Sequence, residues 1–120
     1  MTTFQELYDL VITLRKECPW DREQTLSSFF PCLVEEAEEA RQALAENDML
    51  NFKEELGDVL WNSLFLTRIA EEQGLFSRDD ILRSAKEKMV RRHPHVFEGA
   101  DLKDIKSIEE RWNQIKEQGG

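Results

Sequence analysis

The stretch from Asn51 to Ala70 constrains the fold most, because it is apolar on nearly every side and yet carries acids. Its apolar residues are Phe52, Leu56, Val59, Leu60, Trp61, Leu64, Phe65, Leu66 and Ile69. At about 100° per residue they point almost all the way round a helix axis, which predicts a buried helix. Glu55 and Asp58 nevertheless share one face, with Asn62 in the same sector. Since a buried carboxylate is costly unless paired or metal-bound, these acids are the first indication of function.

A second group of acids lies on the preceding helix, which we expect to be capped by Ser27 or Ser28 and to end near Glu46. Its apolar stripe consists of Phe29, Leu33, Ala37, Ala40 and Leu44. A run of glutamates is usually a solvated face. Here Glu38 points away from the stripe, whereas Glu36 lies inside it, Glu39 at its margin and Glu35 slightly further out. Two inward pairs, Glu36 with Glu39 and Glu55 with Asp58, are therefore expected to converge from antiparallel helices.

The remaining pattern predicts an all-α, single-domain bundle of about four to five helices. A first helix is expected from the Thr3 cap to Lys16, and a fourth from Ser77 to His93. These helices give a core over about residues 3–93, followed by a C-terminal loop and short helix over 94–118. One chain of 120 residues has too few helices to cover the central one. A homodimer or a dimer of dimers is therefore expected to complete the fold.

The composition limits which binding partners and which cellular compartment are expected for this chain. A net charge of −9 argues against nucleic acid, because phosphate backbones need a basic surface. It does not exclude a nucleotide, since a bound cation bridges acids to phosphates. No apolar run reaches the length of a membrane span, and the first residues lack a signal-peptide pattern. Cys18 and Cys32 have no CxxC spacing, so a reduced, cytoplasmic setting is expected.

The acids suit a hard divalent cation. Four or five carboxylates facing one space repel one another strongly without cations, and oxygen ligands of this kind suit Mg²⁺, with Mn²⁺ as a substitute. Two such ions can bind the attacking and leaving oxygens of a phosphoryl transfer, and a spare carboxylate can orient the attacking water. The residues by themselves therefore indicate metal-assisted hydrolysis of a phosphate compound.

Basic and aromatic residues supply candidates for substrate contacts. Lys88, Arg91 and Arg92 share a face near the end of the fourth helix, where they either bind phosphates or complement the helix dipole. Trp20, in the break after the first helix, is either a hydrophobic plug or an aromatic wall for a base.

Two acidic motifs are separated by fifteen residues: Glu35-Glu36-Ala37-Glu38-Glu39 and Glu55-Leu56-Gly57-Asp58. Together they resemble the EExxE…ExxD signature of MazG-type nucleoside triphosphate pyrophosphohydrolases. Three further stretches resemble the same family, and the likeness covers roughly residues 10–117. They are Cys18-Pro19-Trp20-Asp21, Arg91-Arg92-His93-Pro94-His95-Val96-Phe97, and Arg111-Trp112 with Ile115-Lys116. Some family members carry two tandem copies of this pattern, and this chain has one.

The resemblance implies an all-α oligomer that cleaves nucleoside triphosphates between the α and β phosphates, with Mg²⁺ as cofactor. The products are the monophosphate and pyrophosphate, in house-cleaning or nucleotide-pool control. The implied metal ligands are Glu36, Glu39, Glu55 and Asp58, and Glu35 and Glu36 are the catalytic candidates. The implied substrate contacts are Lys88, Arg91, Arg92, Trp20, Trp112 and Asn62.

Three alternatives compete with this interpretation. One is a related pyrophosphohydrolase specific for dUTP or dCTP. Another, a ferritin-like di-iron bundle, is discounted, because it needs Glu-x-x-His pairs and the only histidines, His93 and His95, flank Pro94 outside any helix core. The third is a non-catalytic helical dimer whose acids only affect solubility, against which the inward placement of Glu36 and Asp58 argues.

Overall fold

The computed structural model describes all 120 residues and confirms the predicted all-α class. Its helices are α1 (Phe4–Glu17), α2 (Pro19–Glu23), α3 (Leu26–Ala45), α4 (Met49–Glu72), α5 (Arg78–Arg91), α6 (Pro94–Phe97) and α7 (Ile105–Glu117). They form two compact units, Met1–Arg78 and Asp79–Gly120, which we describe separately. The single-domain organisation expected from the sequence stays a prediction. No helix is long and apolar enough to cross a membrane.

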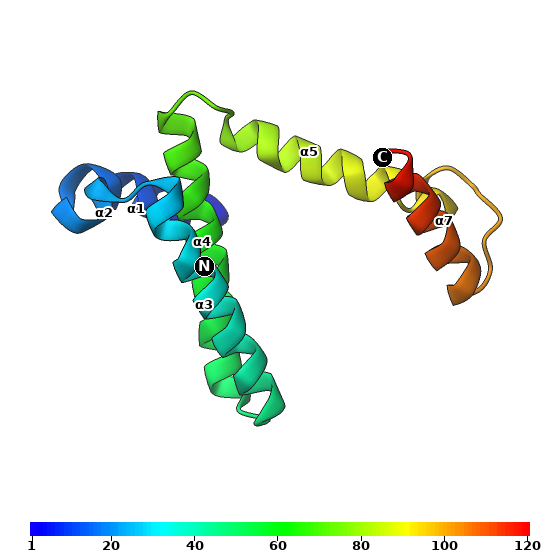
Figure 1. Ribbon diagram of the computed structural model, residues 1–120, viewed down its shortest axis with the longest axis horizontal. Coiled ribbons are helices and arrows are strands. Elements are labelled where there is room, and N and C mark those ends of the chain that lie inside the picture. Colours follow the sequence, from blue (N-terminus) through cyan, green and yellow to red (C-terminus); the bar gives the residue numbers. More distant parts are fainter. The chain divides into compact units, whose positions relative to one another are not determined.

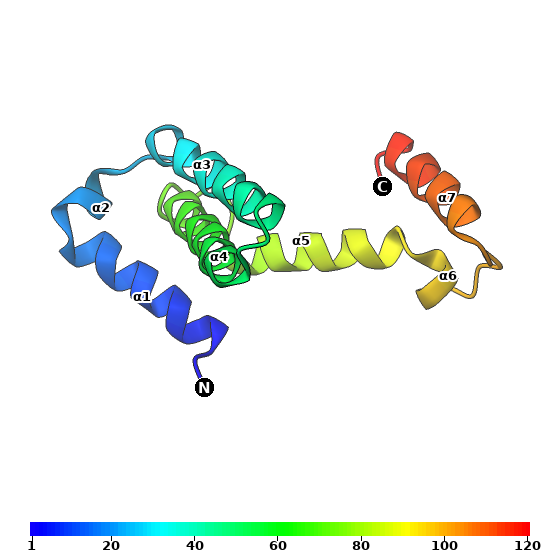
Figure 2. The same ribbon diagram turned by 90° about the horizontal axis from the view of Figure 1, so that it is seen from below.

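The first unit is built on an antiparallel pair of helices, α3 and α4, which lie side by side (Figures 1 and 2). The turn between them places Asn47 at a φ of 55°, a left-handed conformation that Asn tolerates better than most residues. Asp48 then caps α4 by accepting a hydrogen bond from the Asn51 amide at 3.2 Å. Local backbone preferences therefore account for the turn and the cap at Asn47-Asp48. Helix α1 packs against α4 beside this pair.

The core of this unit lies around the C-terminal half of α4. Buried side chains from α1, α3 and α4 meet there, and the Phe29 and Phe65 rings stack with centroids 4.1 Å apart. The buried cluster consists of Tyr8, Val11, Phe29, Leu64, Phe65 and Ile69. Burial of the α4 C-terminal half, expected from its apolar residues, is therefore confirmed.

The N-terminal half of α4 corrects the prediction of a helix buried on every side. Leu56 is 50% exposed and Leu60 is 47% exposed. On the neighbouring α3, Phe30 and Val34 are also more than half exposed. The physical reason is that one chain offers only α1 and α3 to cover α4, and the contacts with α1 involve the other half of the helix.

Several helix ends differ from the expected positions. Thr25, and not Ser27 or Ser28, caps α3, in a reciprocal capping box in which Ser28 is the second partner. Two short helices, α2 and α6, occupy stretches expected to be a break and a loop. Each begins with a proline, whose fixed φ and missing amide proton suit the first helical position.

The second unit contains the remainder of α5, followed by α6 and α7. No residue of α5 is buried, whereas Pro94 of α6 and Ile115 of α7 are. Trp112 on α7 has the Arg92 guanidinium over its ring at 5.2 Å and the edge of the His93 ring at 5.1 Å. These contacts link α7 to the segment that follows α5.

Candidate metal centre

Three carboxylates from α3 and α4 meet in the first unit. Glu36 and Glu39 lie one turn apart on α3, and Glu55 faces them from α4. One oxygen atom from each of the three lies within 4.8 Å of the others. This spacing allows a single divalent cation to contact all three residues after small side-chain adjustments. Three of the four acids expected to converge from two antiparallel helices therefore do so, and their role as metal ligands stays a prediction.

Two of these side chains carry buried oxygens that lack hydrogen-bond partners. Glu36 and Glu55 are half-buried, and the Oε2 atom of each is buried without a partner. A buried carboxylate oxygen in this condition is unfavourable unless a proton or a cation satisfies it. The donor set is made of hard oxygen atoms, which fits Mg²⁺ or Mn²⁺ and not a soft metal.

The crowding of the carboxylates favours protonation of Glu36. Once protonated, the Glu36 carboxyl can share a hydrogen bond with Glu55, and this bond, burial and the nearby Glu39 together raise the pKa of the Glu36 carboxyl from 4.5 to about 8. In the metal-free protein a proton therefore takes up part of the negative charge near neutral pH. A bound cation would replace that proton.

Glu35 and Asp58 are both exposed in the chain by itself, and Asp58 does not belong to the group of three. The prediction that these acids lie in a poorly solvated space is thus confirmed for Glu36 and Glu55. It is wrong for Asp58 and Glu39, which are exposed. The reason is that the outer side of α4 is uncovered at this level. Glu38 is solvated as predicted and pairs with Arg41.

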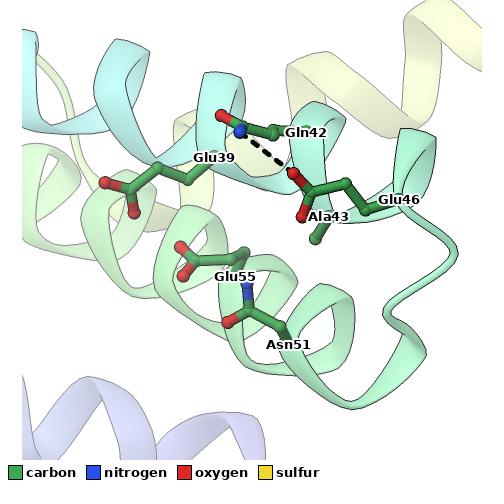
Figure 3. Close-up of a pocket in the computed structure, with 6 residues that line it drawn as sticks. All are labelled: Glu39, Gln42, Ala43, Glu46, Asn51 and Glu55. Atoms are coloured by element: carbon green, nitrogen blue, oxygen red, sulfur yellow. Dashed lines mark hydrogen bonds between the residues drawn. The ribbon is translucent and has the colours of Figure 1, made fainter.

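A pocket of about 170 Å³ adjoins the carboxylates (Figure 3). Figure 3 shows the carboxyl groups of Glu39 and Glu55 extending in the same direction from neighbouring helices. The other lining residues are Gln42, Ala43, Glu46 and Asn51, and Gln42 Nε2 donates to Glu46 Oε1 at 3.2 Å. The sequence analysis missed these residues. Their helical spacing was the available signal, because Gln42 lies one turn after Glu39, and Asn51 one turn before Glu55.

Trp20 and Asn62, two predicted substrate contacts, lie in different environments. Trp20 on α2 is 59% exposed, with its ring edge against Phe29 at a centroid distance of 6.4 Å. Such exposure argues against the buried plug and leaves the aromatic surface accessible. Asn62 is only 6% exposed and is the one buried polar residue of the chain. Their contacts with a substrate stay predictions.

The predicted phosphate-binding residues lie in the second unit. Lys88 and Arg91 are exposed in the last turn of α5, where both phosphate binding and dipole complementation remain open. Arg92 is engaged differently, because its Nε and Nη2 atoms donate to the Gly120 carbonyl at 3.0 and 2.8 Å. Its guanidinium also covers Trp112. Arg92 and Trp112 therefore support each other, and their roles toward a nucleotide stay predictions.

Comparison with known proteins identifies the family. Residues 24–97 match the MazG nucleotide pyrophosphohydrolase domain. The chain is 39% identical over 99 residues to the nucleoside triphosphate pyrophosphohydrolase of Escherichia coli K12, covering 82% of this chain and 38% of that protein. It is 42% identical over 117 residues to the nucleoside triphosphate pyrophosphohydrolase/pyrophosphatase MazG of Thermotoga maritima, covering 96% and 44%. The chain thus spans less than half the length of these relatives.

The fold has a close counterpart among solved structures. The crystal structure of a mazG-related protein from Thermotoga maritima superimposes with a TM-score of 0.82 and 24% sequence identity, covering 94% of this chain and 98% of that one. This likeness concerns the fold, while the family rests on the sequence matches. The all-α architecture, the EExxE…ExxD motif and the matched domain agree, and the chain belongs to the MazG nucleotide pyrophosphohydrolase family.

Proposed function

We propose that this chain hydrolyses nucleoside triphosphates to the monophosphate and pyrophosphate in a Mg²⁺-dependent reaction. The observation that carries the proposal is the convergence of Glu36, Glu39 and Glu55, two of which have buried carboxylate oxygens without partners. Such a site is unfavourable by itself and favourable around a hard cation. The names of the relatives support the reaction class, and the length difference leaves the substrates of this chain to be measured.

In this proposal the acids have two roles, binding the cation and activating the attacking water. Glu36, Glu39 and Glu55 would hold the cation, and Asp58, one turn beyond Glu55 on α4, would complete the set. When bound, Mg²⁺ would neutralise phosphate charge and lower the barrier for attack by water. Glu35 is exposed beside Glu36, and one of these two carboxylates would orient the attacking water or accept its proton. Mn²⁺ would substitute, because it takes similar oxygen ligands.

Other residues would bind the nucleotide outside the carboxylate cluster. Lys88, Arg91 and Arg92 supply positive charge for the β and γ phosphates. Trp20, Trp112 and Asn62 supply aromatic and amide groups for the base and sugar. The cellular role would be house-cleaning or control of the nucleotide pool.

The direct test is a panel of ribo- and deoxyribonucleoside triphosphates, assayed for pyrophosphate release with and without Mg²⁺. Release of pyrophosphate and not orthophosphate, only in the presence of Mg²⁺ or Mn²⁺, is the expected result. Glu38→Gln is the matched control because Glu38 lies on the same helix and points to solvent. Activity confined to dUTP or dCTP would favour the narrow-substrate alternative. No hydrolysis of any triphosphate would contradict the proposal.

The basic residues of α5 give a second measurable expectation. Lys88→Ala or Arg91→Ala should weaken triphosphate binding by about 1.5–3 kcal/mol, roughly 10- to 150-fold, through loss of one charge-assisted hydrogen bond. Binding of the monophosphate should change little, since it lacks the β and γ phosphates. Titration calorimetry with both nucleotides measures the difference. Equal effects on the two ligands would mean that these residues only complement the helix dipole.

We also propose that a second copy of the chain covers the exposed apolar residues of α3 and α4. A homodimer, or a dimer of dimers, is expected to bury roughly 2,000 Å² or more of total surface. Leu56→Glu and Leu60→Glu should therefore shift the assembly toward monomers, because each places a charge in the contact. Light scattering at micromolar concentration measures the mass. A monomeric parent protein would contradict this expectation.

A further inference from the structure

Arg15 connects three parts of the first unit through one guanidinium group. It lies near the C-terminal end of α1, and its side chain is only 10% exposed. Its Nη1 atom donates to the backbone carbonyls of Asp21 at 2.6 Å, Gln24 at 2.9 Å and Arg22 at 3.3 Å. The other two guanidinium nitrogens bind Glu72, the last residue of α4. Nε donates to the two carboxylate oxygens of Glu72 at 3.2 and 3.1 Å, and Nη2 donates to Oε1 at 2.5 Å.

The segment that receives these bonds has little else to hold it. Helix α2 is five residues long, has no buried residue and has no side-chain cap bond. A helix this short does not persist without tertiary contacts. The other side-chain hydrogen bonds of this region are solvent-exposed: Gln24 Nε2 to the Trp20 carbonyl at 3.1 Å, Arg22 Nη1 to the Lys16 carbonyl at 3.2 Å, and Ser28 Oγ to Gln24 Oε1 at 2.9 Å. Arg15 is therefore the buried anchor of the segment.

Only arginine matches this set of acceptors. Its guanidinium presents five donors in a rigid plane, so one edge can bind a carboxylate while the other reaches backbone carbonyls. The Phe65 ring lies 5.7 Å from the Arg15 guanidinium carbon and supports its face. A lysine keeps the positive charge for Glu72, but its single ammonium group cannot bind both the carboxylate and three carbonyls in this geometry.

We propose that Arg15 is a positioning residue for nucleotide binding, which acts by fixing α2 and thereby the exposed Trp20 ring. The inference rests on the proposed function, in which Trp20 meets the base or sugar. Glu72 contributes to this positioning, because its carboxylate holds the Arg15 guanidinium in the orientation that reaches residues 21–24. The carboxylate cluster is a separate set of residues and does not depend on Arg15 for its ligands.

The first test compares Arg15→Lys and Arg15→Gln with the parent protein. Backbone amide hydrogen exchange in residues 18–25 is expected to accelerate about tenfold or more. KM for the best triphosphate should rise about tenfold, whereas kcat should stay within about twofold, because the metal ligands are unchanged. Arg78→Lys is the matched control. The Arg78 guanidinium also covers an aromatic ring, Tyr8 of α1 at 4.7 Å, but its Nη1 atom donates to Gln5 Oε1 and not to the carbonyls of residues 21–24.

A double-mutant cycle separates positioning from general stabilisation. Trp20→Ala by itself should raise KM, and adding Arg15→Lys should then raise KM no further, because Arg15 acts through Trp20. Glu72→Gln should give an intermediate rise in KM and in exchange. This variant also keeps the inference testable if Arg15→Gln fails to fold.

Two results would overturn the inference while leaving the proposed function intact. One is an active Arg15→Lys variant with parental KM and parental exchange in residues 18–25. The other is additive effects of Arg15→Lys and Trp20→Ala on KM. A parent protein that hydrolyses no triphosphate would instead overturn the proposed function, and the exchange experiment would still measure the anchoring of α2.

Discussion

Glu55→Gln is expected to reduce triphosphate hydrolysis by roughly three orders of magnitude, because in the proposed function it would remove a ligand of the cation that neutralises charge and positions water. The fold should survive the change. In the metal-free protein Glu55 is half-buried among like charges, so the neutral amide relieves repulsion. The variant should therefore melt no lower than the parent in the absence of Mg²⁺. Assays of pyrophosphate release and thermal melts measure the two effects.

The response to Mg²⁺ distinguishes a metal ligand from a structural acid. At a free concentration about 100 times its Kd, a ligand stabilises the native state by about 2.7 kcal/mol. The parent should show this increase in the free energy of unfolding, and Glu55→Gln should show little of it. Glu54→Gln is the control, because Glu54 is the exposed neighbour on the same helix. A much lower melting point of metal-free Glu55→Gln with an unchanged Mg²⁺ response would refute the metal site.

Asp58→Asn tests the fourth predicted ligand in the same experiments. Asp58 is exposed and outside the group of three, so its loss should leave the metal-free melting point unchanged. Arg68, the cation further along α4, pairs with Glu71 and Glu72 and not with Asp58. A large loss of activity with a weakened Mg²⁺ response is expected if Asp58 completes the site. Parental activity of Asp58→Asn would remove it from the ligand set.

Mg²⁺ affinity is expected to increase strongly with pH below about 8, the pKa to which Glu55, burial and Glu39 raise the Glu36 carboxyl. Binding of the cation must displace that proton, so affinity should rise by about tenfold per pH unit and level off above the pKa. Between pH 6 and pH 8 the predicted change is roughly a hundredfold. Titration calorimetry in buffers of different ionisation enthalpy measures both the affinity and the protons released.

The same pKa fixes the sign of the stability change in the metal-free protein. Because the Glu36 pKa is raised by folding, the folded state binds more protons than the unfolded state between pH 4.5 and about 8. Its contribution to the free energy of unfolding is therefore complete below pH 4.5 and is lost as pH rises to about 8. Glu36→Gln should flatten this dependence. A metal-free parent whose stability from this group increased over the same range would contradict the assignment.

The local pattern of the sequence determined the five longer helices, α1, α3, α4, α5 and α7, and which acids share a helix face. A 3.6-residue period specifies which side chains share a face, so Glu36 and Glu39 were separable from Glu38 without tertiary information. The turn at Asn47-Asp48 and the C-terminal glycine of α4, Gly74 at a φ of 71°, also follow from local backbone preferences. The family motif then supplied the reaction class, which no helical period can specify.

Tertiary packing decided the rest, because burial and long-range contacts are not local properties. The apolar pattern of α4 did not show that α1 covers only its C-terminal half, which left Leu56 and Asp58 exposed. The pairing of Arg15 with Glu72 joins residues 57 positions apart, a contact that no local spacing specifies. The sequence by itself therefore predicted that Glu36, Glu39 and Glu55 converge, and it wrongly placed Asp58 in the same poorly solvated group. Only the packed chain decided which of them are buried, and therefore which oxygens need a cation.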